Sequence, residues 1–190
     1  METATKAWVS VDDYLELEYF TNSRFEYLDG EIREMSYASE NHELIVANMV
    51  RLIGNFLLGK DYRVYPSNRL LHVPECNGYY YADAMVVAGK PVFAKYKRNM
   101  VATLNPAVLI EVLSGSTEQY DQRVKWGCYQ KISTLRHYAM VSQDRMLIEL
   151  YSRTDESANW LYTSVEKPEQ VITVLGGQVS VSDLYTNVEF

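Results

Sequence analysis

The chain has 190 residues, of which 47% are hydrophobic, and it carries a formal net charge of −7 with a pI of about 5.0. This length and composition suit one compact core, and the lack of any run of about eighteen apolar residues excludes a transmembrane helix. No repeat, low-complexity tract or linker divides the chain, so we expect a single domain over residues 1–190.

The N-terminal residues METATKAWVS lack the apolar stretch of a secretory signal peptide, and we therefore expect a cytoplasmic protein. Cys76 and Cys128 have no CxxC pattern and no Cys/His ligand spacing around them, which argues against a zinc site. The two cysteines could form a disulfide, but without an export signal we predict that they are free thiols.

The acidic balance weighs against a nucleic-acid partner, because affinity for phosphate backbones rests largely on Lys and Arg. It does not exclude one, since a nuclease site itself needs clustered carboxylates. Basic residues are also concentrated locally, in residues 90–98 (KPVFAKYKR) and 123–131 (RVKWGCYQK).

Three elements are predicted in the first third of the chain. Residues 10–19 begin with a serine followed by acidic residues, which indicates the start of a helix. Residues 24–35 alternate apolar and polar side chains around Asp29-Gly30, a dipeptide that tolerates positive φ and predicts a hairpin. Residues 41–58 have apolar side chains at helical spacing, with Asn41 as the predicted N-cap and Gly59 as the stop.

The rest of the chain reads mainly as strands with one helix between them. The expected elements are two short extended pieces in 62–73, a strand over 79–87, a buried central strand over 108–113, a helix over 117–132 capped by Ser116 or Thr117, strands over 137–142 and 146–152, one or two strands after residue 160, and a short helix over 181–185. This succession predicts an α/β sandwich.

Two acidic residues stand alone inside apolar, strand-like segments: Asp83 in YYYADAMVV and Glu111 in VLIEVL. A buried carboxylate is costly, so it is normally neutralised, paired with a cation or bound to a metal. If the two strands are adjacent, the acids place hard oxygen ligands together, an arrangement that suits Mg²⁺ or Mn²⁺.

Each of these residues also has a simpler explanation. A single acid in a strand more often faces solvent at the strand end or pairs with an arginine. Two acids in matching contexts, followed by a basic helix, favour a functional site. In that helix Lys125 can position a water molecule or balance charge on a phosphate, although a lysine considered alone is usually a solvated surface residue.

Six motifs follow one another along the chain: RFEYLDGEI, NHELIVANM, YYYADAMVV, NPAVLIEVLS, STEQYDQRVKWGCYQ and LRHYAMV. In this order they resemble the Uma-two family of restriction endonucleases, from about Val11 to the C-terminus. The resemblance implies a PD-(D/E)xK nuclease of the α/β (α+β) class, with a restriction-endonuclease-like mixed sheet flanked by helices. It also implies that Asp83 and Glu111 are the two acids of the nuclease motif.

The resemblance further implies a set of metal ligands, namely Asp83, Glu111 and the backbone carbonyl of Val112, around Mg²⁺ or Mn²⁺. The general nuclease motif has a lysine two residues after the second acid, where this chain has Leu113. In the Uma-two pattern the lysine comes from the following helix, and Lys125 matches that position.

Two residues in the N-terminal part match the family as well. Glu26 matches an upstream acid that many such nucleases add to the metal site, and it could equally pair with Arg24 or a lysine on an exposed hairpin. His42 matches a histidine at the start of the long helix. It could contact phosphate at that helix N-terminus, but we favour a cap or packing residue.

We therefore predict a Mg²⁺- or Mn²⁺-dependent DNA endonuclease with Asp83, Glu111, Lys125 and Glu26 as its catalytic residues. A homodimer is plausible, because cutting both DNA strands usually needs two sites, and no membrane partner is expected. Two alternatives stay open. One is a catalytically degenerate module of the same fold that binds nucleic acid, and the other is a regulatory protein whose main role is association.

Overall fold

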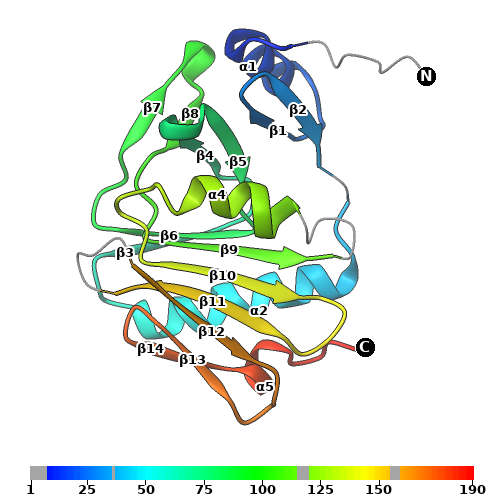
Figure 1. The fold of residues 1–190 in the computed structure, drawn as a ribbon, viewed down its shortest axis with the longest axis vertical. Helices are drawn as coiled ribbons and strands as arrows, with labels where there is room; N and C mark the ends of the chain where they lie inside the picture. The colour runs from blue at the N-terminus through cyan, green and yellow to red at the C-terminus, as the bar shows by residue number, and fades with distance from the viewer. Residues whose placement is uncertain (1–7, 36, 115–119, 155–158) are drawn as a thin grey trace.

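The computed structural model describes residues 8–35, 37–114, 120–154 and 159–190, which form two six-stranded mixed sheets, a two-stranded sheet and four α-helices (Figure 1). The predicted mixed α and β fold class is confirmed. In the described part of the chain, no helix is long and apolar enough to cross a membrane.

The first large sheet, called here the N-terminal sheet, has the strand order β2-β1-β5-β4-β8-β7. Its strands are β1 (Phe25–Leu28), β2 (Glu31–Glu34), β4 (Leu70–Val73), β5 (Gly78–Tyr81), β7 (Phe93–Lys95) and β8 (Val101–Thr103). Helix α1 (Val11–Phe20) packs against this sheet, with Tyr14 of the helix against Tyr27 and Tyr79.

The second large sheet, called here the central sheet, has the order β12-β11-β10-β9-β6-β3. Its strands are β3 (Tyr62–Pro66), β6 (Ala84–Ala88), β9 (Val108–Leu113), β10 (His137–Ser142), β11 (Ile148–Arg153) and β12 (Trp160–Val165). Strands β9 and β10 are parallel, and every residue of β9 is buried, as predicted for a central strand.

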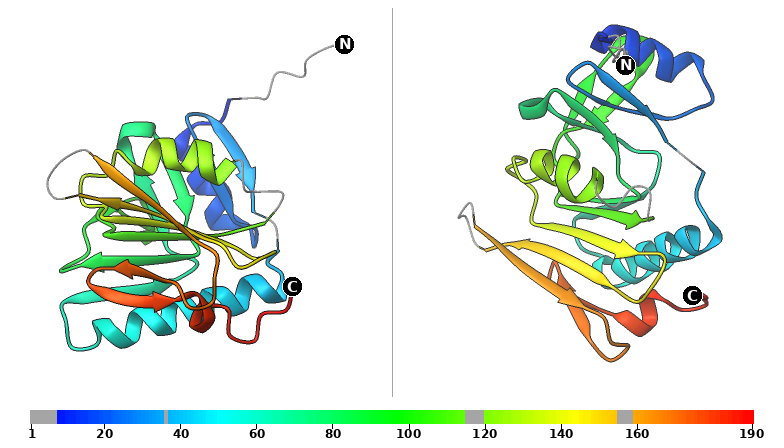
Figure 2. Two further views of the ribbon diagram at one scale, coloured as in Figure 1. Left: turned by 60° about the horizontal axis from the view of Figure 1, so that its bottom comes forward. Right: turned by 45° about the vertical axis from the view of Figure 1, so that its right-hand side comes forward.

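Helices cover both faces of the central sheet (Figure 2). One face packs against α2 (Glu40–Leu57), the hairpin β13 (Val171–Val174) and β14 (Gly177–Ser180), and α5 (Val181–Leu184). The other face packs against α4 (Trp126–Tyr129) and against Leu71 and Tyr80 of the N-terminal sheet. Helix α4 therefore lies between the two large sheets.

The two helices and the hairpin predicted at the N-terminal end are present, and one predicted helix cap is wrong. The Ser10 side chain caps α1, and the β1–β2 hairpin turns at Asp29 and Gly30, both with positive φ. The cap of α2 is Ser39, whose hydroxyl accepts the backbone N–H of His42. The predicted cap, Asn41, lies inside the helix and donates instead to the carbonyl oxygens of Gln143 and Glu189.

The predicted strand over residues 79–87 is wrong, because two strands in different sheets share that segment. Strand β5 ends at Tyr81 in the N-terminal sheet, and β6 begins at Ala84 in the central sheet. Asp83 lies in the junction between them. Aromatic and β-branched residues favour extended structure on both sides of this junction, so their pattern cannot reveal the change of sheet.

The predicted helix over residues 117–132 ends earlier than expected, and its described part is less regular. Its described part has a π-helical turn, η3 (Asp121–Lys125), followed by α4, which ends at Tyr129. The proposed caps Ser116 and Thr117 lie outside the described residues. A π-helical turn inside a helix is uncommon and occurs often at functional sites.

The prediction of free thiols is wrong, since Cys76 and Cys128 form a disulfide in the structure. Cys76 ends the 3₁₀ helix η1 (Pro74–Cys76) between β4 and β5, and Cys128 lies in α4. Folding brings their Cα atoms to 5.8 Å although 52 positions separate them in sequence. The bond therefore links α4 to the N-terminal sheet.

Breaking this crosslink should lower the free energy of unfolding by about 4 kcal/mol, from the loop-closure entropy of 52 residues. The measurement is urea unfolding of the wild type with and without dithiothreitol, compared with Cys76→Ser. Dithiothreitol should not change the stability of the variant, which provides the control. Equal stability of oxidised and reduced wild type would contradict the crosslink.

Candidate active site

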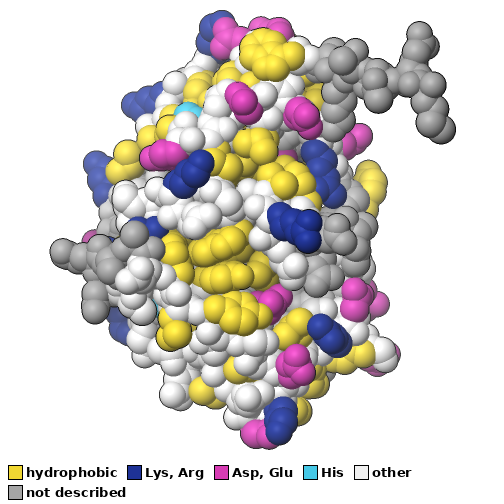
Figure 3. Space-filling view, in the orientation of Figure 1, with side chains coloured by type: hydrophobic (Ala, Val, Ile, Leu, Met, Phe, Trp, Pro, Cys, Tyr) yellow, Lys and Arg dark blue, Asp and Glu magenta, His cyan; other side chains and the backbone are white. Residues whose placement is uncertain are grey.

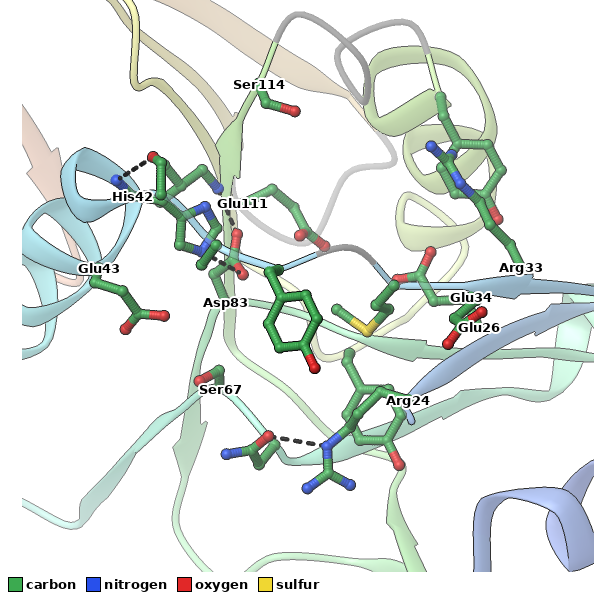
Figure 4. A pocket seen from close by; sticks show the side chains of 18 of the residues that line it. Arg24, Glu26, Arg33, Glu34, His42, Glu43, Ser67, Asp83, Glu111 and Ser114 are labelled. Carbon is green, nitrogen blue, oxygen red and sulfur yellow. Dashed lines mark hydrogen bonds and ion pairs between the residues drawn. The ribbon is translucent and has the colours of Figure 1, made fainter. Parts of the chain in front are cut away.

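A cleft of about 610 Å³ gathers the residues that were predicted to carry chemistry (Figure 4). Its walls come from the β1–β2 hairpin, the first turn of α2, the β3–β4 connection, the junction before β6, the end of β9 and the segment before α4. Glu26, Asp83, Glu111, Val112 and Lys125 all line it.

Asp83 and Glu111 lie at the same end of a pair of neighbouring strands. Strands β6 and β9 are antiparallel, with Ala84 opposite Ile110, and the two acids are the next residues at that end. Both are nearly buried, with 8% of Asp83 and 3% of Glu111 exposed. The backbone N–H of Val112 donates to Oδ2 of Asp83 at 2.7 Å, which joins the Asp83 carboxylate to the strand that carries Glu111.

Lys125 lies between two of the carboxylates. Its Nζ is 2.8 Å from Oε1 of Glu26 and 3.2 Å from Oε2 of Glu111. Only 5% of Lys125 is exposed, so its ammonium group is shielded from water. The structure therefore places the lysine beside two of the acids, and the alternative of a solvated surface lysine is wrong.

Glu26 reaches this cluster from the N-terminal sheet. It lies on β1 and is 4% exposed, so the exposed position in the alternative is wrong, while the lysine partner that the alternative expected is present. Lys125 is one of its partners. Glu26 and Glu111 therefore come from different sheets and share one ammonium group, which makes charge balance in the cluster depend on how the sheets are packed.

Tyr129 is a member of the cluster to which no role was assigned from the sequence, although its four-residue spacing from Lys125 indicates a shared helix face. Its hydroxyl donates to Oε1 of Glu111 at 2.9 Å. Burial, followed by the nearby charges of Glu111 and Glu26, raises the pKa of Tyr129 well above its usual value, so the hydroxyl stays a donor. The available signal was its position one helical turn after Lys125, which places the two side chains on one face.

His42 contacts Asp83 rather than acting as the predicted cap or packing residue. Its Nε2 lies 3.1 Å from Oδ1 of Asp83, while its backbone N–H is bound by Ser39 (Figure 4). Both oxygens of Asp83 thus have a partner, one from α2 and one from β9. No spacing in the sequence points to this contact, because it joins two distant elements.

Comparison with protein families decides what kind of protein carries this cleft. A family model described as "Uma2: Putative restriction endonuclease" matches residues 11–182. The chain belongs to the Uma2 family. The resemblance read from the sequence motifs is therefore confirmed.

Relatives and a solved structure agree with this membership. The uncharacterized protein sll1609 of Synechocystis sp. is 30% identical over 165 residues, covering 87% of this chain and 92% of the relative. A second uncharacterized protein of that organism, slr1290, is 27% identical over 183 residues, covering 96% and 94%. A crystal structure described as a putative nuclease belonging to DUF820, from Anabaena variabilis, has a TM-score of 0.75 at 16% identity, covering 94% of this chain and 98% of that one. It shows a shared fold.

The acids of this Uma2 protein are dispersed rather than gathered into a closed metal cage. Within the described ranges, no group of three or more His, Cys, Asp or Glu side chains is arranged to hold a metal ion. Glu26 and Glu111 are joined through Lys125, and Asp83 has partners of its own. A cation here would depend on two carboxylates together with backbone and water oxygens.

Replacing Lys125 with methionine should lower the free energy of unfolding by about 3–5 kcal/mol, because it leaves two buried glutamates without their shared cation. Urea unfolding at neutral pH in EDTA measures the change. The matched control is Lys131→Met, an exposed lysine beyond α4, which should change stability little.

Adding Glu26→Gln to Lys125→Met should recover part of the loss, since only one buried charge then stays uncompensated. Equal stability of Lys125→Met and Lys131→Met would contradict the view that the lysine balances both acids.

Proposed function

We propose that this protein is a metal-dependent endonuclease that hydrolyses phosphodiester bonds in DNA. The observation that carries the proposal is the cleft itself, which is lined by three nearly buried carboxylates, two of them in contact with one lysine. Membership of the family described as "Putative restriction endonuclease" supports the reaction class. The proposal assigns the chemistry to the residues in the cleft, because a fold alone does not determine function.

The proposed metal ligands are Asp83, Glu111 and the backbone carbonyl of Val112. Two carboxylates and a carbonyl fit Mg²⁺ or Mn²⁺, since Mg²⁺ commonly keeps several waters and takes only one or two protein carboxylates. The cluster also carries three acids against one lysine, an excess of negative charge that a divalent cation would reduce. Bound there, the cation would supply a water of lowered pKa and withdraw charge from the phosphate.

Lys125 is assigned the role of orienting the attacking water or balancing the negative charge that develops on the phosphate. Its contacts with Glu26 and Glu111 fix the ammonium group within the cleft. Glu26 is assigned a positioning role, because it holds Lys125 from the N-terminal sheet. Tyr129 holds the Glu111 carboxylate from α4.

A second candidate is a catalytically inactive module of the same fold that binds nucleic acid or regulates a partner. The observation in its favour is that the acids already have partners within the protein. Lys125 contacts Glu26 and Glu111, while His42 and the Val112 amide contact Asp83. The net charge of −7 fits the regulatory form of this candidate better than the form that binds nucleic acid, because it weakens attraction for phosphate. Cutting both strands of a duplex would need two sites, so the nuclease proposal includes a homodimer.

The test of the proposal is cleavage of plasmid and oligonucleotide DNA in Mg²⁺ or Mn²⁺. The isosteric variants Asp83→Asn and Glu111→Gln should each lose at least about a hundredfold in rate, and EDTA should abolish cleavage. Asp144→Asn, on an exposed turn outside the cleft, serves as the control and should cut like wild type.

Identical rates for wild type and Asp83→Asn would refute the assigned site. Absence of cleavage together with absence of Mn²⁺ binding by calorimetry would support the inactive module instead.

A further inference from the structure

Two arginines on the β1–β2 hairpin face the same cleft as the acids. Arg24 immediately precedes β1, and Arg33 lies on β2 directly opposite Glu26. Residues paired across an antiparallel ladder share a face of the sheet, so Arg33 lies on the side from which Glu26 reaches Lys125. Figure 4 shows Arg24 and Arg33 on the hairpin side of the cleft, with His42 on the other side.

Both guanidinium groups are held in place by neutral groups. Nε of Arg24 donates to Oδ1 of Asn68 at 3.0 Å, and its Cζ lies 5.2 Å from the centre of the Tyr81 ring. Cζ of Arg33 lies 4.3 Å from the centre of the Tyr120 ring. Stacking on a ring fixes the plane of a guanidinium and leaves its N–H edge available for a ligand.

Neither arginine is neutralised by a carboxylate in the described residues. The ion pairs recorded there involve Arg63 and Arg98, which lie away from the cleft, but not Arg24 or Arg33. Glu34 and Glu43 also line the cleft, yet no recorded ion pair joins either of them to these arginines. Two preorganised cations at the edge of a site made of acids indicate an anionic ligand.

The face of the molecule drawn in Figure 3 has no single basic patch that would compete for such a ligand. On the face seen in Figure 3, Lys and Arg side chains are scattered among Asp and Glu rather than gathered into one patch. The chain as a whole carries −7. Because the net charge repels a polyanion, attraction has to come from individual cations at the binding site. Arg24 and Arg33 line the same cleft as the acids.

We infer that Arg24 and Arg33 bind two backbone phosphates of a nucleic-acid strand along the hairpin wall and so place the bond to be cut beside Asp83 and Glu111. The inference rests on the proposed nuclease function and adds the residues that hold its substrate. Arginine suits this role because its planar fork of donors matches two phosphate oxygens. Such contacts carry no sequence information, so they hold any sequence equally.

The experiment measures DNA binding in EDTA by Asp83→Asn, so that cleavage does not interfere, over a range of salt concentrations. Adding Arg24→Gln or Arg33→Gln should weaken binding about tenfold and reduce the slope of log K against log salt by about 0.7–0.9 each. The loss should be the same for unrelated sequences. Arg33→Lys should recover part of the affinity, because it restores the charge without the fork.

The matched control is Arg145→Gln, an exposed arginine on the β10–β11 turn outside the cleft, which should leave affinity and salt slope unchanged. With Asp83 intact, the two hairpin variants should raise KM for cleavage and leave kcat nearly unchanged. Unfolding in urea checks that each variant is folded.

The outcomes separate this inference from the function on which it rests. If wild type cuts DNA while both hairpin variants keep the affinity and salt slope of the Arg145 variant, the inference fails and the nuclease function stands. If wild type neither binds nor cuts nucleic acid, the proposed function fails and the inference falls with it.

Discussion

The shared contact of Lys125 with Glu26 and Glu111 is the interaction on which the rest of the cleft depends. Each acid is nearly buried, and bringing two such carboxylates together without a cation would cost several kcal/mol. The glutamates come from different sheets, and the lysine comes from the helical segment between them. One ammonium group therefore joins the packing of three layers to the electrostatics of the proposed active site.

Several features of the fold serve to hold that segment in place. The disulfide between Cys76 and Cys128 fastens α4 to the N-terminal sheet, and the Tyr129 hydroxyl fastens it to β9 through Glu111. On the other side of the cleft, His42 and the Val112 amide hold both oxygens of Asp83. The acids are thus fixed before any ligand arrives, which is the preorganisation that electrostatic catalysis requires.

The sequence predicted those parts of the structure that depend on local chemistry. Ser10 caps a helix, Asp29-Gly30 makes a hairpin turn, and an unbroken apolar run became the buried strand β9. The motif order also predicted the family and the gathering of Asp83, Glu111 and Lys125 in one cleft. The roles of these residues stay predictions.

The features that the sequence did not predict depend on contacts between distant segments: the change of sheet between Tyr81 and Ala84, the disulfide, and the contact of His42 with Asp83. A local pattern of residues carries no information about such contacts.

The structure and the family together lead us to propose that Asp83 and Glu111 form a divalent-cation site. A crystal structure of the protein soaked in Mn²⁺ tests this proposal most directly. We expect one anomalous peak, bound by these two carboxylates and the Val112 carbonyl, and no such peak in Glu111→Gln. Saturating Mn²⁺ that leaves no peak there would contradict it.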